Sequence, residues 1–258
     1  MKPITIKPLP ATPFAKRGIY GTGRSDLPER FRWLHPDAAS SIMRLEKNYP
    51  GVFRFSDVLR SPAGSKRVRT KYKKRHGRFG GKLPGYSAHG FGLATDHDVD
   101  GNLKRLAKQL GAPRVEKRAY DELLRDYGWV CHRDGPQGDH RPGSEDWHFN
   151  FFADDMARWG GRRYNTSKTS GGVEAKVQAL YGPFTLNKRE VQRALAAQGL
   201  YRGAIDGRHG AKTRTAVAGF QRQWTLKSDG DAGAKTQRVL CFVNARFVTS
   251  RGHSVSPW

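Results

Sequence analysis

The order of apolar and polar residues predicts helices and strands intermixed through the first two thirds of the chain. Helical periodicity runs from Pro36 to Asn48 and from Arg114 to Tyr127, and each segment is expected to form a helix. Short alternating patterns at Leu93–Val99 and Trp147–Phe152 predict strands instead. Because these elements do not follow a regular βαβ order, this part of the chain is expected to have an α+β fold.

The last third of the chain predicts a small helical bundle. The string from Asp206 to Thr213 is echoed from Asp229 to Thr236, and each copy places an Asp-Gly turn before a helix-like segment. In both copies alanine stands directly before the lysine, where a phosphate-binding P-loop needs glycine, so nucleotide binding is not expected. The three predicted helices are Asn187–Gln198, Lys212–Gln223 and Lys235–Phe242.

Between these two parts, a Ser-, Thr- and Gly-rich stretch at residues 165–172 is expected to form a linker. The length of 258 residues is sufficient for two packed domains. We therefore expect an α+β domain at 1–164, the linker at 165–172, a helical domain at 173–245 and a C-terminal tail at 246–258.

The net charge of the chain indicates the kind of partner that it binds. Lys and Arg total 47 against 23 Asp and Glu, and the formal charge of +24 predicts a polyanionic partner: nucleic acid, an anionic membrane or an anionic wall. Ten basic residues lie between Arg60 and Lys82, and no acidic residue occurs between Asp57 and Asp96. This run is either a solvated loop with helical tendency or a basic face that attracts an anionic wall or outer-membrane surface.

Cysteine usage and targeting signals restrict the class of protein further. Cys131 and Cys241 do not indicate a disulfide framework and are expected to be small buried side chains. Residues Met1–Tyr20 lack an apolar run of signal-peptide length, and no stretch is apolar enough to span a bilayer. We expect a protein made in the cytoplasm that another protein releases if it acts outside.

Two short strings in the N-terminal part carry candidate chemistry. His89, Asp96 and His148 are the nitrogen and oxygen ligands that a catalytic zinc ion takes, with a fourth position left for water. Glu145 is a nearby carboxylate for removing a proton from that water. Asp98 shares a strand face with Asp96, which makes it a rival ligand or a partner of a ligand. Since the chain has nine histidines, spacing alone leaves the metal site open.

The strand pattern around His148 also predicts which side chains face the core. Alternation places His148, Asn150 and Phe152 on one face. The opposite, apolar face is expected to contain Trp147, Phe149 and Phe151.

These strings resemble a known signature. Ser87-x-His89-x-x-Gly-x-Ala-x-Asp96, followed by Glu145-x-Trp-His148, is similar to the motif of the zinc DD-carboxypeptidase and L-alanyl-D-glutamate peptidase (VanY-type) family, which includes the vancomycin-resistance D,D-peptidases. The resemblance implies that the two histidines and Asp96 bind one zinc ion and that Glu145 is the general base. It also implies a small antiparallel sheet with helices.

The same family places an arginine upstream that helps to hold the substrate carbonyl or carboxylate. Arg60 lies at the expected distance, although the usual Gly-Tyr before the arginine is absent, and one more surface arginine is the alternative. Ser87 is expected to form a hydrogen bond near the metal and so to contribute to substrate binding, with a turn or cap serine as the alternative.

The helical part resembles a second family. Its apolar and glycine positions between Val191 and Thr236 are similar to those of the three-helix peptidoglycan-binding domain, over roughly residues 173–243. This resemblance implies peptidoglycan as the partner. The glycan contacts are expected outside the Asp-Gly turns, which are interpreted as structural.

Together the two resemblances imply a phage endolysin. The expected activity is zinc-dependent hydrolysis of a stem-peptide amide, L-Ala–D-Glu, by a monomer that stays in the host cytoplasm until release and then acts in the wall or periplasm. One alternative is a D,D-carboxypeptidase or D,D-endopeptidase that remodels the wall. A basic nucleic-acid-binding protein is the other; the chain has no finger, helix-turn-helix or RNA-binding signature, so no specific nucleic acid is expected.

Overall fold

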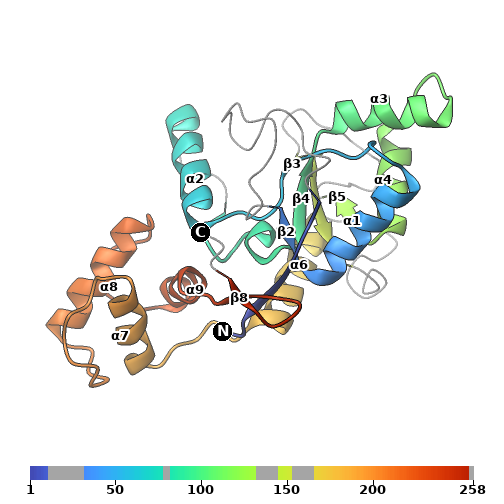
Figure 1. Ribbon diagram of the computed structural model, residues 1–258. Coiled ribbons are helices and arrows are strands. Elements are labelled where there is room, and N and C mark those ends of the chain that lie inside the picture. The colour runs from blue at the N-terminus through green and yellow to red at the C-terminus, as the bar shows by residue number, and fades with distance from the viewer. Residues whose placement is uncertain (11–31, 78–81, 132–144, 153–165, 256–258) are drawn as a thin grey trace. The chain divides into compact units, whose positions relative to one another are not determined.

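The computed structural model describes residues 1–10, 32–77, 82–131, 145–152 and 166–255 (Figure 1). The chain divides into two compact units. The sheet unit contains Thr5–Arg60, Ala88–Val177 and Phe247–Trp258, and the helical unit contains Met1–Ile4, Ser61–Ser87 and Gln178–Arg246. The expected combination of an α+β part and a helical part is confirmed.

The main sheet of the sheet unit has four antiparallel strands. They are β3 (Phe55–Asp57), β4 (Ala94–His97), β6 (His148–Phe151) and β5 (Trp129–Cys131), in that spatial order. All four residues of β4 are buried, so this central strand is covered on both faces. Strands β4 and β6 fall within the segments predicted from alternation.

One expectation about β6 was wrong. Trp147 was assigned to the apolar face of the strand, yet its side chain is 43% exposed. The strand begins only at His148, and Trp147 lies in the preceding turn, where the strand alternation does not apply. Phe149 and Phe151 are buried as expected, but Asn150 on the other face is buried too, since both faces of the sheet are covered.

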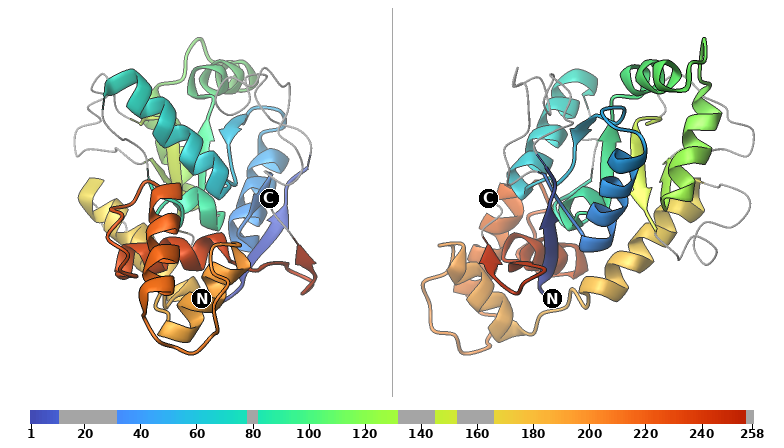
Figure 2. Two further views of the ribbon diagram at one scale, coloured as in Figure 1. Left: turned by 90° about the vertical axis from the view of Figure 1, so that its left-hand side faces the viewer. Right: turned by 45° about the vertical axis from the view of Figure 1, so that its right-hand side comes forward.

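Three amphipathic helices accompany this sheet: α1 (Pro36–Asn48), α3 (Val99–Leu110) and α4 (Lys117–Asp126). Helix α1 has the predicted bounds, and proline at its first position suits a site that needs no N–H donor. The indole of Trp129 donates to Ser41 Oγ at 3.0 Å, which ties β5 to α1. Figure 2 shows α1 beside the sheet and near α4.

A second sheet joins both ends of the chain. Its strands are β2 (Trp33–Leu34), β1 (Ile4–Pro8), β7 (Phe247–Thr249) and β8 (Ser254–Val255), in that order. Residues 246–258 were expected to be a tail, but β7 and β8 pair as an antiparallel hairpin within this sheet. Strands of two or three residues are too short to produce a recognisable alternation, so the pattern did not predict them.

The helical unit contains the three predicted helices: α7 (Lys188–Ala197), α8 (Ala211–Gln223) and α9 (Ala234–Val243). They enclose one apolar core. Its buried members include Val191, Leu195, Val217, Phe220, Val239 and Leu240. Both cysteines of the chain, Cys131 and Cys241, are buried, as expected.

The repeated Asp-Gly turns are each held by a buried glutamine from the preceding helix. Gln192 Nε2 donates to Asp206 Oδ1 at 2.9 Å, while Gln192 Oε1 accepts from the amide of the glycine that follows, at 2.8 Å. Gln221 repeats both contacts at the second turn, with Asp229 at 2.8 Å and the next glycine at 2.9 Å. The internal echo in the sequence is therefore a repeated structural device.

The basic segment belongs to the helical unit, although 1–164 was expected to be one domain. It forms α2 (Pro62–His76) and continues to Tyr86. Leu83 and Tyr86 pack against the apolar core of the helices, and the Arg238 guanidinium of α9 lies 4.2 Å from the centre of the Tyr86 ring. Local periodicity does not report contacts between residues more than a hundred positions apart, so the boundary at 164 missed them.

Most of the residues that were expected to form a linker are helical in the structure. Residues 166–172 lie in α6 (Thr166–Tyr181), and residue 165 is outside the described residues. Extending an existing helix is easier than starting one, so a helix that includes Val173–Tyr181 can continue through weak helix formers. None of the described helices has the length and apolar character needed to cross a bilayer.

Candidate metal centre

His89 is delivered by a short 3-10 helix, η3 (Ala88–Phe91), and its side chain is completely buried. The ring atom Nδ1 lies 2.8 Å from the carbonyl oxygen of Val58. A carbonyl can only accept, so Nδ1 carries the proton and Nε2 keeps its lone pair. This hydrogen bond therefore orients His89 with a ligand nitrogen facing the centre of the site.

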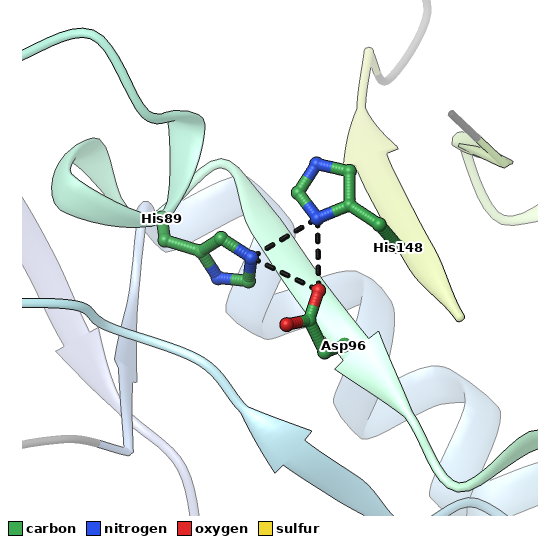
Figure 3. A group of neighbouring side chains, drawn as sticks. All are labelled: His89, Asp96 and His148. Atoms are coloured by element: carbon green, nitrogen blue, oxygen red, sulfur yellow. Dashed lines mark hydrogen bonds and ion pairs between the residues drawn. The ribbon is translucent and has the colours of Figure 1, made fainter. Parts of the chain in front are cut away.

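Asp96 and His148 face the same point from adjacent strands. They are cross-strand partners of β4 and β6, which brings their side chains together. His148 Nδ1 lies 2.8 Å from Asp96 Oδ1, and His89 Nε2 lies 3.1 Å from the same oxygen. Figure 3 shows the three side chains converging.

The three inner atoms are all lone-pair atoms in the neutral ring forms. His148 Nε2 lies 3.2 Å from the amide oxygen of Asn150 and donates to it, which leaves Nδ1 as an acceptor. Two imidazole nitrogens and a carboxylate oxygen then face one another within 4.8 Å. A cation among them would satisfy all three, and this donor set suits zinc. Among the described residues no other such group of three occurs.

The electrostatics of Asp96 favour its ionised form. Burial raises the pKa of the carboxyl, but when the two histidines are protonated and donate to Asp96, their charges and hydrogen bonds outweigh burial and hold that pKa well below its ordinary value. Asp96 is therefore held as a carboxylate, which is the form that binds a metal ion.

Arg60 lies behind Asp96. Its Nη2 is 3.3 Å from Asp96 Oδ2, and its Nε is 2.7 Å from Asp57 Oδ2. Asp57 and Asp96 are cross-strand partners of β3 and β4, so one guanidinium bridges two buried carboxylates. Arg60 thereby engages Oδ2 of Asp96 and leaves Oδ1 directed at the histidines.

The remaining predicted residues occupy different places. Glu145 begins the turn before β6; its side chain is exposed, and its carbonyl accepts from the amide of His148 at 3.0 Å. Ser87 is buried two residues before His89, in the stretch assigned to the helical unit. Asp98 is not part of the group, because its carboxylate pairs with Arg105 at 3.0 Å and it directly precedes helix α3.

Sequence reasoning missed the residues that position the ligands: Asp57, Asn150 and the carbonyl of Val58. The closeness of Asp57 and Arg60 in the sequence is the signal that could have found Asp57. It also missed His97, which bonds Thr95 at 2.9 Å and Tyr120 at 2.7 Å inside the core. Burial, with the charge of Lys117, lowers the pKa of His97 to about 3, so this histidine stays neutral and structural.

Comparison with known families identifies one part of the chain. Residues 187–240 match the family model described as "Putative peptidoglycan binding domain". This segment contains the helices α7 and α8 and most of α9, and we refer to it below as the peptidoglycan-binding domain. The expected three-helix resemblance is confirmed over these residues.

Two curated relatives share shorter stretches with the chain. "Putative OxPP cycle protein OpcA" of Synechococcus elongatus is 36% identical over 76 residues, which is 30% of this chain and 17% of the relative. "N-acetylmuramoyl-L-alanine amidase CwlM" of Mycobacterium tuberculosis is 34% identical over 65 residues, which is 25% of this chain and 16% of the relative. The chain thus matches only a small fraction of each relative.

Among solved structures, the chain is similar to the one described as "Structure of the LdcB LD-carboxypeptidase reveals the molecular basis of peptidoglycan recognition". The TM-score is 0.42 and the identity 15%, with 61% of this chain and 72% of that chain covered. The site assignments rest instead on the geometry of His89, Asp96 and His148.

Proposed function

We propose that the chain is a zinc-dependent peptidoglycan peptidase of the endolysin type. The observation that carries the proposal is the convergence of three acceptor atoms, from His89, Asp96 and His148, in a chain that also carries a peptidoglycan-binding domain. A metal-ligand cluster without the domain would not indicate the class of substrate. The domain without the cluster would suggest a binding protein alone.

His89, Asp96 and His148 would hold the zinc ion. When bound, the ion supplies a Lewis acid that polarises the scissile carbonyl and makes its water more acidic. The chain prepares for this role by orienting each ligand through a further contact, from the carbonyl of Val58, the guanidinium of Arg60 and the amide of Asn150.

Glu145 would act as general base and then as general acid. It accepts a proton from the attacking water, whose oxygen adds to the carbonyl carbon, and returns the proton to the leaving nitrogen as the C–N bond breaks. Its position supports this role: it lies three residues before His148, in the turn closed by the hydrogen bond between their main chains. Its side chain is exposed to solvent.

Arg60 has two proposed tasks. Its contacts with Asp57 and Asp96 make it a positioning residue for a ligand. The second task is stabilisation of the developing oxyanion on the substrate, a role that rests on the resemblance to the peptidase family. Ser87 is proposed to contribute to substrate binding, because it lies two residues before His89.

The proposed bond is L-Ala–D-Glu of the stem peptide. A carboxypeptidase trims a free tail and leaves a crosslinked wall intact, whereas a lytic enzyme must cut a bond on which the mesh depends. Cutting near the base of the stem frees the peptides from the glycan strands. As an endolysin, the protein would remain in the host cytoplasm until another protein opens the membrane, and would then work on the wall as a monomer.

Digestion of purified peptidoglycan with mass spectrometry of the fragments tests the proposal. We expect new N-terminal D-Glu with L-Ala left on the muramyl side, about one zinc per chain by elemental analysis, and loss of cleavage after chelation. Release of free D-Ala as the main product would assign the chain to wall-remodelling carboxypeptidases. Full activity in metal-free protein would refute the zinc mechanism, and DNA retention without cleavage would favour the nucleic-acid alternative.

A further inference from the structure

Helix α2 is polar on all sides and carries one sign of charge. Its 15 residues contain no acidic side chain, and only Pro62 and Ser65 are buried. Its basic side chains are Lys66, Arg67, Arg69, Lys71, Lys73, Lys74 and Arg75. A helix that inserts into a lipid surface needs an apolar face beside its basic face, and α2 has no such face.

The helix is nevertheless built with defined ends. Ser61 Oγ accepts from the amide of Gly64 at 2.9 Å, proline occupies the first position, and Gly77 ends the helix in a left-handed conformation. Inside the helical unit, α2 contacts the end of α8. Arg69 Nε lies 3.4 Å from Thr225 Oγ1, and Lys66 Nζ lies 5.8 Å from the centre of the Trp224 ring.

The charge pattern of α2 destabilises the helix. Arg67, Lys71 and Arg75 follow one another at four-residue spacing, where like charges destabilise a helix, and no acid of α2 offsets them. All three side chains are exposed. A partner with closely spaced negative charges would remove this repulsion, which makes a polyanion the partner that α2 fits.

We propose that α2 is a second wall-binding surface, which binds the carboxylates of peptidoglycan stem peptides. The inference rests on the proposed function and names a further contact with the same substrate. The helical unit that holds α2 also holds the peptidoglycan-binding domain, so α2 is carried to a polymer whose peptides bear repeated carboxylates. Ammonium and guanidinium groups form charge-assisted hydrogen bonds with carboxylates.

The test compares two variants of the full chain with the same change in net charge. Both carry Glu145→Gln so that the wall fragments stay intact. The α2 variant replaces Lys71, Lys74 and Arg75 with Gln, a residue of similar helix propensity. The control variant replaces three exposed lysines of α1 and α3 in the sheet unit: Lys47, Lys104 and Lys108.

Binding is measured by co-sedimentation with insoluble peptidoglycan over a range of salt concentrations, and thermal melts check that both variants fold. We expect the α2 variant to bind roughly threefold or more weakly at low salt, since each exposed ion pair contributes a modest amount. The difference should shrink as salt rises. The control variant should bind like the parent. Blocking the wall carboxylates as amides should remove the advantage of the parent over the α2 variant.

Equal binding by the α2 and control variants would overturn the proposal. So would an advantage that survives blocked carboxylates but disappears when phosphate-bearing wall polymers are extracted, because the partner would then be a phosphate polymer. Weaker binding of the α2 variant to DNA or anionic vesicles, with unchanged binding to peptidoglycan, would assign α2 to those partners. None of these binding measurements requires hydrolysis. Their outcome therefore does not depend on whether the peptidase proposal is correct.

Discussion

At the scale of single residues, the candidate site is a set of side chains that hold one another in place. The buried Asp96 uses one oxygen for two histidines and the other for Arg60. Its ionised form is stabilised from both sides, which explains why a carboxylate can remain in this interior. A change at Arg60 should therefore affect the metal ligands more directly than it affects the substrate.

Arg60→Gln is expected to weaken zinc binding by roughly ten- to a hundredfold, the usual effect of removing a partner of a metal ligand. Asp96 would lose the contact that directs Oδ1 toward the histidines. Competition with a chelating dye measures the affinity directly, and Arg60→Lys serves as the variant that keeps the charge. Unchanged zinc affinity with a reduced turnover number would instead place Arg60 at the substrate alone.

Glu145→Gln should retain zinc and lose cleavage by roughly a hundred- to ten-thousandfold, because a positioned acid–base group is removed while the ligands remain. His148→Ala should lose both properties. Elemental analysis and peptidoglycan digestion, run on the same samples, separate the two effects. If Glu145→Gln keeps near-normal activity, the base is elsewhere, and Asp146 in the same turn becomes the candidate.

At the scale of elements, the peptidoglycan-binding domain depends on helices that hold their own turns. Gln192 of α7 and Gln221 of α8 are buried, and each joins its helix to the following Asp-Gly turn. The hydrogen bond from Gln192 lowers the pKa of Asp206, and the bond from Gln221 does the same for Asp229. The two turns are thus fixed by polar contacts.

Gln192→Met is expected to destabilise the domain by about 1–3 kcal/mol, because buried partners lose their hydrogen bonds. The pKa of Asp206 should rise toward its ordinary value, which an NMR pH titration measures. In the parent, the lowered pKa contributes stability above the ordinary value of the carboxyl, and this contribution is lost as the pH falls through the lowered pKa. The variant should lose less stability over that acid range.

Gln223→Met, at an exposed position near the end of α8, is the matched control for this change. It should alter the free energy of unfolding by less than about 0.5 kcal/mol. An equal loss in both variants would show that the contacts of Gln192 do not hold the turn.

At the scale of the whole molecule, the two compact units do not follow the order of the chain. The segment Ser61–Ser87 lies between the strand that positions Asp57 and the 3-10 helix that carries His89, yet it belongs to the helical unit. Gly85 shows how closely it packs there, since a Cβ at this position would lie 2.9 Å from Cβ of Phe242. The chain therefore passes between the units several times.

Gly85→Ala and Gly77→Ala form a matched pair that tests this packing. Both glycines have positive φ, of +79° and +70°, so alanine carries a backbone cost of about 1–2 kcal/mol at either site. Only Gly85 faces Phe242; nothing lies within 4 Å of a Cβ at Gly77. We expect Gly85→Ala to cost about 1–3 kcal/mol more in the free energy of unfolding, from overpacking. Equal costs in denaturant titrations would contradict the assignment of this segment.

Much of this protein was determined by sequence patterns that act over short distances. Helix α1 begins at a proline and buries one face, so its bounds follow from local residues. The helices of the peptidoglycan-binding domain follow from periodicity and repeated turns in the same way. The convergence of His89, Asp96 and His148 was predicted from a motif and is found in the structure.

Only the tertiary structure decided which distant segments meet. It placed Arg60 between Asp57 and Asp96, joined the last strands of the chain to its first strands in one sheet, and joined residues 61–87 to helices far along the chain. The physical reason is that local periodicity reports which face of an element is apolar, but not which surface will cover that face. Burial of Leu83 and Tyr86 against the helical core depends on shapes that exist only once the chain has folded.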